Sequence, residues 1–126
     1  MMNIVLWIMQ ILLAAVFLMA GLMKVTQPRE KLATNTNMGW IDGFEDGHLK
    51  LIGTLEILGA LGLIIPAVTG ILPILTPLAA VGLALTMVGA IITHLRRQEY
   101  PNLIVNIVLL AMALFVAYGR FVLLPL

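Results

Sequence analysis

The sequence predicts an all-α fold, an integral membrane four-helix antiparallel bundle that forms one domain over residues 1–126. Only 10% of the residues are charged and 62% are hydrophobic, whereas a soluble domain carries roughly a quarter charged residues. The mean hydropathy is +1.12. Four apolar runs reach the ~18 residues that mark a helix able to cross a bilayer. These predicted helices span approximately residues 4–24, 49–67, 71–94 and 102–124.

The first predicted helix repeats small or polar residues every three or four positions, among them Gln10, Gly21 and Lys24. This spacing forms one face of a helix. Small and polar side chains mark contacts between helices in membranes. No Lys or Arg precedes the run, and the run is longer than the apolar segment of a signal peptide. We therefore expect this helix to be retained.

The long connection, residues 25–48, is predicted to lie at the membrane interface. Trp40 and Phe44 are four residues apart among glycines and acidic residues, a pattern typical of interfacial segments. A connection of this length is also compatible with a lid over the bundle.

The second predicted helix carries the acidic residue Glu56 inside an apolar run and ends at about Pro66. A bare charge in hydrocarbon costs at least about 2.5 kcal/mol, so Glu56 must have a partner, be protonated or face a cavity. In the third helix, we expect Pro73 in the first turn and a kink at Pro77. Beyond it, a stripe of small residues is predicted to let a neighbouring backbone approach: Ala79, Gly82, Thr86, Gly89 and Thr93.

Four polar residues, one from each helix, are predicted to lie in the same half of the bilayer: Lys24, Glu56, His94 and Asn106. Helices one and three end on that side and helices two and four begin there. One interpretation is a ligand-binding pocket, with Glu56 as an acceptor or proton carrier and His94 as a donor or base. The other is a buried contact, such as an ion pair of Lys24 with Glu56, that fixes the helix register.

Arg120 is predicted at the opposite end of the fourth helix, near Gln10. We expect a cation that snorkels towards the interface, or a fifth ligand-binding residue that clamps an anionic head group. No metal site is predicted, because Glu56, His94 and the distant His48 are too few ligands. The absence of Cys excludes disulfides and iron–sulfur clusters within the chain. A formal charge of +1 without a basic tail gives no sign of nucleic-acid binding.

The cations are distributed unevenly between the two sides of the predicted bundle. Six lie on the side of the first and third connections: Lys24, Arg29, Lys31, Lys50, Arg96 and Arg97. On the side of the termini lies Arg120. The positive-inside rule therefore places connections 25–48 and 94–102 in the cytoplasm and both termini outside.

Five stretches in order along nearly the whole chain carry a family resemblance: 17–24 (FLMAGLMK), 51–66 (LIGTLEILGALGLIIP), 78–83 (LAAVGL), 89–97 (GAIITHLRR) and 118–120 (YGR). The chain resembles the DoxX-like family of small four-helix bacterial membrane proteins. The resemblance implies a multi-pass protein of the bacterial inner membrane. The family is named after a subunit associated with thiosulfate:quinone oxidoreductase, and wider relatives look like redox-complex components, amine-dehydrogenase maturation factors and assembly chaperones. Since this chain has no thiol and no redox motif, the resemblance does not imply electron transfer by the chain alone.

Three functions follow as hypotheses. The first is a bundle that binds a small amphiphile, a quinone or a lipid, in the polar pocket, or that acts as an accessory subunit of a membrane redox system. The second is a membrane enzyme in which Glu56 and His94 form an acid–base pair on a quinone- or isoprenoid-like substrate. The third is an assembly chaperone. No cofactor is evident in the sequence, and a quinone is the candidate. The expected partners are membrane lipids, a membrane redox partner or further copies of the chain.

Overall fold

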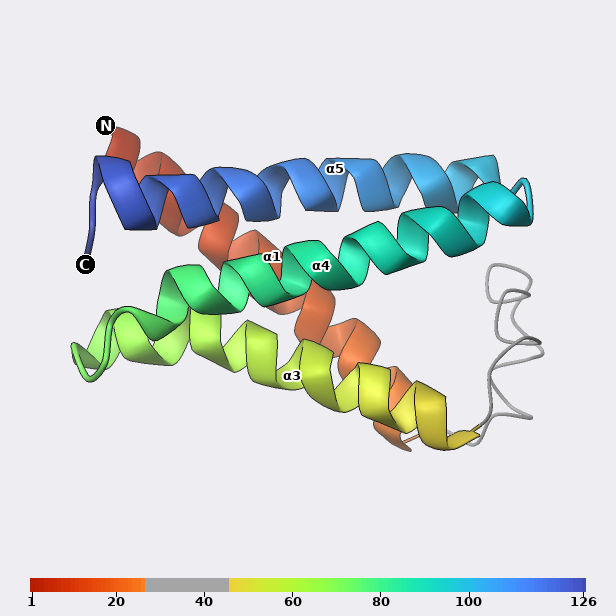
Figure 1. Cartoon of the computed structure of the whole chain (residues 1–126). Helices are drawn as coiled ribbons and strands as arrows, with labels where there is room; N and C mark the ends of the chain where they lie inside the picture. Colours follow the sequence, from red (N-terminus) through yellow and green to blue (C-terminus); the bar gives the residue numbers. More distant parts are fainter. Residues whose placement is uncertain (27–45) are drawn as a thin grey trace.

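A computed structural model describes residues 1–26 and 46–126 (Figure 1). This part of the chain is all-helical, which confirms the predicted fold class. The elements are α1 (Met2–Thr26), α3 (Asp46–Thr69), α4 (Leu75–Arg96), α5 (Tyr100–Tyr118) and a π-helical turn, η2 (Gly119–Leu123). Most of the predicted interfacial connection, including Trp40 and Phe44, lies outside the described residues.

Four helices of the described part are each long and apolar enough to cross a membrane. At most 33% of any of their apolar windows is buried inside the chain, so most apolar side chains point outward. Leu85 on α4 and Leu58 on α3, for example, are 68% and 59% exposed. An apolar surface this extensive is stable only against lipid or another protein.

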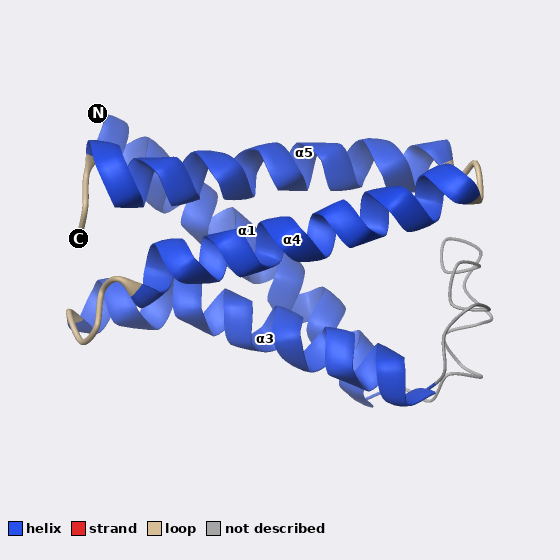
Figure 2. Cartoon of the chain, in the orientation of Figure 1, coloured by secondary structure: helices blue, strands red, loops and turns tan. Residues whose placement is uncertain are grey.

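The helices exchange neighbours along the length of the bundle. Figure 1 shows α1 running from beside the end of α5 to beside the start of α3, while α4 runs from the end of α3 to the start of α5. The short α3–α4 and α4–α5 connections appear as tan loops at opposite ends in Figure 2. At the end where α1 and α4 finish, the helices thus form two pairs, α1 with α3 and α4 with α5. We call this the loop end, and the opposite one the terminal end.

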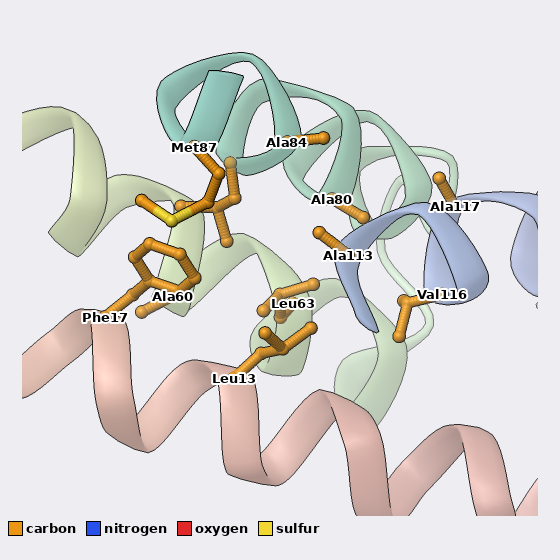
Figure 3. Close-up of a cluster of buried hydrophobic side chains, with 11 residues drawn as sticks. Leu13, Phe17, Ala60, Leu63, Ala80, Ala84, Met87, Ala113, Val116 and Ala117 are labelled. Carbon is orange, nitrogen blue, oxygen red and sulfur yellow. The ribbon is translucent and has the colours of Figure 1, made fainter. Parts of the chain in front are cut away.

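The hydrophobic core fills the middle of the bundle with side chains from all four long helices (Figure 3). The helices α1, α3 and α4 contribute large side chains, and α3, α4 and α5 also contribute alanines. The buried members are Leu13, Phe17, Ala60, Leu63, Ala80, Leu83, Ala84, Met87, Ala113, Val116 and Ala117.

Pro66 lies inside α3, which continues to Thr69, so the predicted end of this helix at the proline is wrong. A proline removes one helix hydrogen bond and displaces the preceding turn, which frees nearby carbonyl groups. Two of these carbonyls accept bonds from other helices. The hydroxyl of Thr76 donates to the Gly62 oxygen at 3.0 Å, and Gln10 Nε2 donates to the Leu63 oxygen at 2.8 Å. These bonds offset the missing N–H and allow the helix to continue.

The α3–α4 connection corrects the predicted start of the third helix. Gly70 (φ 72°) and Leu72 (φ 47°) have left-handed backbones, so the helix begins at Leu75 rather than at residue 71. Pro73 therefore precedes the helix instead of lying in its first turn. Pro77 is the third residue of α4, where its missing N–H would have had no helical partner, so the reason for the predicted kink disappears.

The predicted stripe of small residues on α4 is only partly packed within the described chain. Ala79 contacts α3, because a Cβ added to Gly62 would lie 2.8 Å from the Ala79 Cβ. A Cβ added to Gly82 or Gly89, in contrast, would meet no atom within 4 Å. The expected close backbone approach at these two glycines is therefore wrong for the described part of the chain. Close approach occurs instead between α1 and α3.

Candidate functional site

The closest contact between α1 and α3 is formed by Gly21 and Gly53 near the loop end. A Cβ added to Gly21 would lie 2.6 Å from the Gly53 oxygen, and a Cβ on Gly53 would lie 2.8 Å from the Gly21 oxygen. Side chains lean towards the N-terminus of their own helix. In an antiparallel pair, Lys24 and Glu56, each one turn beyond its glycine, therefore lean towards each other. Lys24 Nζ donates to Glu56 Oε1 at 2.8 Å.

This ion pair is almost completely removed from solvent, with 10% of the Lys24 side chain and 4% of the Glu56 side chain exposed. A charge at such a position is costly unless its partner is fixed in good geometry. The glycine contact supplies that geometry, because it brings the two backbones together one turn from each charge. The pair thus joins α1 to α3 at the loop end.

His94 lies in the last turn of α4 and is paired with a residue that the sequence did not point to, Glu99. His94 Nδ1 is 3.0 Å from Glu99 Oε1, and Arg97 Nε donates to the same oxygen at 3.2 Å. An ionised carboxylate can only accept, so this contact assigns the proton of the neutral ring to Nδ1. Only 6% of His94 is exposed.

The end of α4 explains why Glu99 reaches back to His94. The Glu99 N–H donates to the His94 oxygen at 2.9 Å, the Gln98 N–H donates to the Leu95 oxygen at 3.2 Å, and Gln98 has φ 58°. These are the two bonds and the left-handed residue of a Schellman motif. Glycine usually occupies the left-handed position, so a glutamine there left no recognisable signal in the sequence.

Gln98→Gly is expected to stabilise the protein by about 1 kcal/mol, because a left-handed backbone carries a penalty of this order for residues with a Cβ. Thermal or SDS-induced unfolding of the purified protein, followed by circular dichroism, measures the change. Gln98→Ala is the matched control and should give no such gain, since alanine keeps the Cβ. Equal stability of the glycine and alanine variants would contradict this explanation.

A cavity of about 580 Å³ lies at the loop end between the two helix pairs. Four of the predicted site residues line it together: Lys24, Glu56, His94 and Asn106. Much of the remaining wall is apolar and includes Val16, Phe17, Met23, Leu85, Val105 and Leu109. The structure thus brings four polar residues from four helices to one cavity, with the ion pair as part of its wall.

The cavity wall carries more polar residues near the loop end than deeper in the bundle, although Thr86, about two turns before His94, is a polar residue at the greater depth. Lys24 and His94 are in the last turns of α1 and α4, and Asn102 is in the first turn of α5. Phe17 and Leu109 lie about two turns deeper, roughly 10 Å towards the middle of the bundle. Phe17 also belongs to the hydrophobic core. The cavity is therefore amphipathic, with its polar end at the loop end.

Arg120 lies at the terminal end, away from the residues that line this cavity. Its Nε donates to Gln10 Oε1 at 2.7 Å and its Nη1 donates to Asn3 Oδ1 at 2.8 Å, while the guanidinium carbon is 5.7 Å from the centroid of the Trp7 ring. Only 2% of Arg120 is exposed, so the expected snorkelling is wrong. The cause is η2, in which the Leu124 N–H donates to the Gly119 oxygen at 2.7 Å and thereby shifts the helix register.

A family model with the description DoxX-like family matches residues 8–116. The chain belongs to the DoxX-like family. Four membrane-capable helices together with this membership make the DoxX-like chain a multi-pass membrane protein. The match includes every residue of the cavity wall and ends before Arg120. No curated protein and no solved structure matches the chain.

Three further polar residues of the DoxX-like cavity were not singled out as site residues: Thr86, Thr93 and Asn102. The hydroxyl of Thr86 donates to the Gly82 oxygen at 3.1 Å, and that of Thr93 donates to the Gly89 oxygen at 3.0 Å. Threonines in helices often make such bonds to their own backbone, so their presence in the sequence carries little signal. Because their protons are used in this way, the two hydroxyl oxygens remain as acceptors.

The carboxamide of Asn106 is a polar group that the cavity can offer to a ligand. It lines the wall, is partly exposed and makes no hydrogen bond to another described residue. A carboxamide both donates and accepts, so Asn106 can hydrogen-bond a ligand carbonyl or a ligand hydroxyl. Within the described residues, no three His, Asp, Glu or Cys side chains come together in a group that could hold a metal ion.

Proposed function

We propose that this DoxX-like protein binds a small amphiphile, a quinone or a lipid, in the loop-end cavity. The observation that supports the proposal best is the amphipathic wall, with Asn106 and the Lys24–Glu56 pair at its polar part and Phe17 and Leu109 deeper in the bundle. A ligand with a polar head and an apolar tail matches this gradient.

The size and composition of the cavity agree with this proposal. Small-molecule pockets typically enclose roughly 300–1,000 Å³ and are mostly apolar with a few polar groups that fix orientation. A volume of about 580 Å³ falls within this range. Each 100 Å² of apolar ligand surface buried against the wall contributes about 2.5 kcal/mol before ordering costs are subtracted.

The contacts of Glu56 and His94 within the described residues do not join the two side chains into an acid–base pair. Glu56 is hydrogen-bonded to Lys24, and His94 is bonded to Glu99, while no hydrogen bond joins Glu56 to His94. A general acid and base that act as a unit need to be within hydrogen-bond reach of each other or of one reacting group. The binding hypothesis needs only that both residues form part of the wall.

Filling the cavity tests the proposal. Ala20 lines the cavity on α1, whereas Ala15 on the same helix is exposed on the outer surface. The protein is purified in mild detergent, incubated with short-chain ubiquinone or monoolein, and analysed by native mass spectrometry. We expect a bound amphiphile on the wild type, at least a tenfold weaker signal for Ala20→Phe, and no change for Ala15→Phe.

Circular dichroism shows whether both phenylalanine variants remain folded. A folded Ala20→Phe variant that binds as well as the wild type would overturn the proposal. A wild type that binds neither probe would overturn it as well.

A further inference from the structure

The charged groups at the polar end of the cavity compensate one another. Lys24 Nζ lies 2.8 Å from Glu56 Oε1. Glu99 Oε1 lies 3.0 Å from His94 Nδ1 and 3.2 Å from Arg97 Nε. Each of the two carboxylates therefore has a basic residue beside it, and in the described wall the formal charges of Lys24 and Glu56 cancel. The wall consequently offers polar groups without a net charge.

The affinity of such a site for a ligand depends on the charge of the ligand's head group. A charged head group loses its hydration when it enters the cavity. Charges that are already paired in the wall offer it little electrostatic attraction to offset that loss. An uncharged carbonyl or hydroxyl loses less hydration and can form a hydrogen bond with Asn106. The hydroxyl oxygens of Thr86 and Thr93 add two acceptors for a ligand hydroxyl.

The stem of Lys24 packs against α3, the helix that carries its partner Glu56. A Cβ added to Gly53 would lie 2.8 Å from the Lys24 Cβ, which shows that the lysine stem lies directly against the α3 backbone. Glu56 lies one turn further along α3 with 4% of its side chain exposed. To serve a charged ligand, one partner would have to leave the other behind in an apolar setting.

We propose that the Lys24–Glu56 pair sets the head-group charge that the cavity accepts, so that it admits amphiphiles with uncharged carbonyl or hydroxyl heads and rejects anionic and cationic heads on the same tail. This inference rests on the proposed function, because it assumes that the cavity binds an amphiphile. It adds the chemical class of the ligand and assigns the two charged residues a role in specificity in addition to their role in stability.

Three probes with the same oleoyl or oleyl chain test the proposal: monoolein (uncharged), oleoyl lysophosphatidate (anionic) and oleylamine (cationic). Binding to the full chain in nanodiscs is measured by competition with a fluorescent monoacylglycerol. We expect the wild type to bind monoolein at least tenfold more tightly than either charged probe. Ala20→Phe should reduce binding of all three.

Variants of the pair should change this order in opposite directions. Glu56→Gln removes the negative charge beside Lys24 and should shift preference at least tenfold towards the anionic probe. Lys24→Met leaves the Glu56 carboxylate and should shift preference towards the cationic probe. In the double variant Lys24→Met/Glu56→Met neither position is charged, so the preference for the uncharged probe should be restored. A purely structural role of the pair would not produce this recovery.

The outcomes separate this inference from the proposed function. If no probe binds the wild type, the inference fails, and the proposed function fails with it when short-chain ubiquinone does not bind either. If probes bind, but a charged probe equals or exceeds monoolein on the wild type, only the inference is overturned. The same conclusion holds if folded single variants keep the wild-type order. If the single variants do not fold, the order of the three probe affinities on the wild type and on the double variant still tests the inference.

Discussion

Lys24→Met is expected to lower the free energy of unfolding by about 3–5 kcal/mol, because it leaves the buried Glu56 carboxylate without its ion-pair partner. Replacing both partners should cost much less, since a pair of apolar side chains of similar size often matches a buried ion pair in stability. Lys24→Met/Glu56→Met is therefore expected to be more stable than Lys24→Met, although it carries one more substitution.

SDS titration of the purified protein, followed by circular dichroism, gives the unfolding free energies of the wild type, Lys24→Met, Glu56→Met and the double variant. Together they form a double-mutant cycle that isolates the coupling between the two residues. A double variant that is as unstable as the sum of the single variants would contradict a buried, mutually compensated pair.

Gly21→Ala is expected to destabilise the protein by about 2 kcal/mol, because the added Cβ would lie 2.6 Å from the Gly53 oxygen and 3.1 Å from the Ile57 nitrogen. These are backbone atoms, which cannot rotate away, so α1 and α3 must separate. The separation would also weaken the ion pair one turn away. Helix propensity alone would have favoured alanine by about 1 kcal/mol.

Gly82→Ala is the matched control for this prediction. The substitution is the same and also lies within a long helix, but a Cβ on Gly82 would meet no described atom within 4 Å. We expect a gain of up to about 1 kcal/mol from helix propensity. Thermal unfolding in the same detergent compares the two variants, and a loss of stability for Gly82→Ala, or none for Gly21→Ala, would contradict the packing described here.

The four-helix fold and the Lys24–Glu56 pair could be predicted because the lipid environment restricts the alternatives. Apolar runs of sufficient length must form helices, and an acid among them needs a partner within reach. The shared location of His94 and Asn106 followed from the antiparallel order of the helices. These inferences depend on lengths and positions along the chain, which the sequence states directly.

The features that could not be predicted depend on local backbone geometry. Glu99 reaches His94 only because Gln98 adopts a left-handed conformation that glycine would normally mark. Arg120 is buried because α5 continues as a π-helical turn, for which the sequence has no clear signal. Pro66 is tolerated inside α3 because Thr76 and Gln10 donate to the carbonyls that it frees, and these partners come from distant parts of the chain.

The bonds beside Pro66 make the two ends of the bundle different in how the helix pairs are connected. The Leu63 carbonyl accepts a hydrogen bond from Gln10 of α1, and Gln10 accepts one from Arg120 of η2. The Gly62 carbonyl accepts a hydrogen bond from Thr76 of α4. Three segments are thereby anchored to one turn of α3 at the terminal end. At the loop end the ion pair of Lys24 with Glu56 joins α1 to α3 alone, whereas these side-chain hydrogen bonds, which connect the two helix pairs within the described residues, lie towards the terminal end.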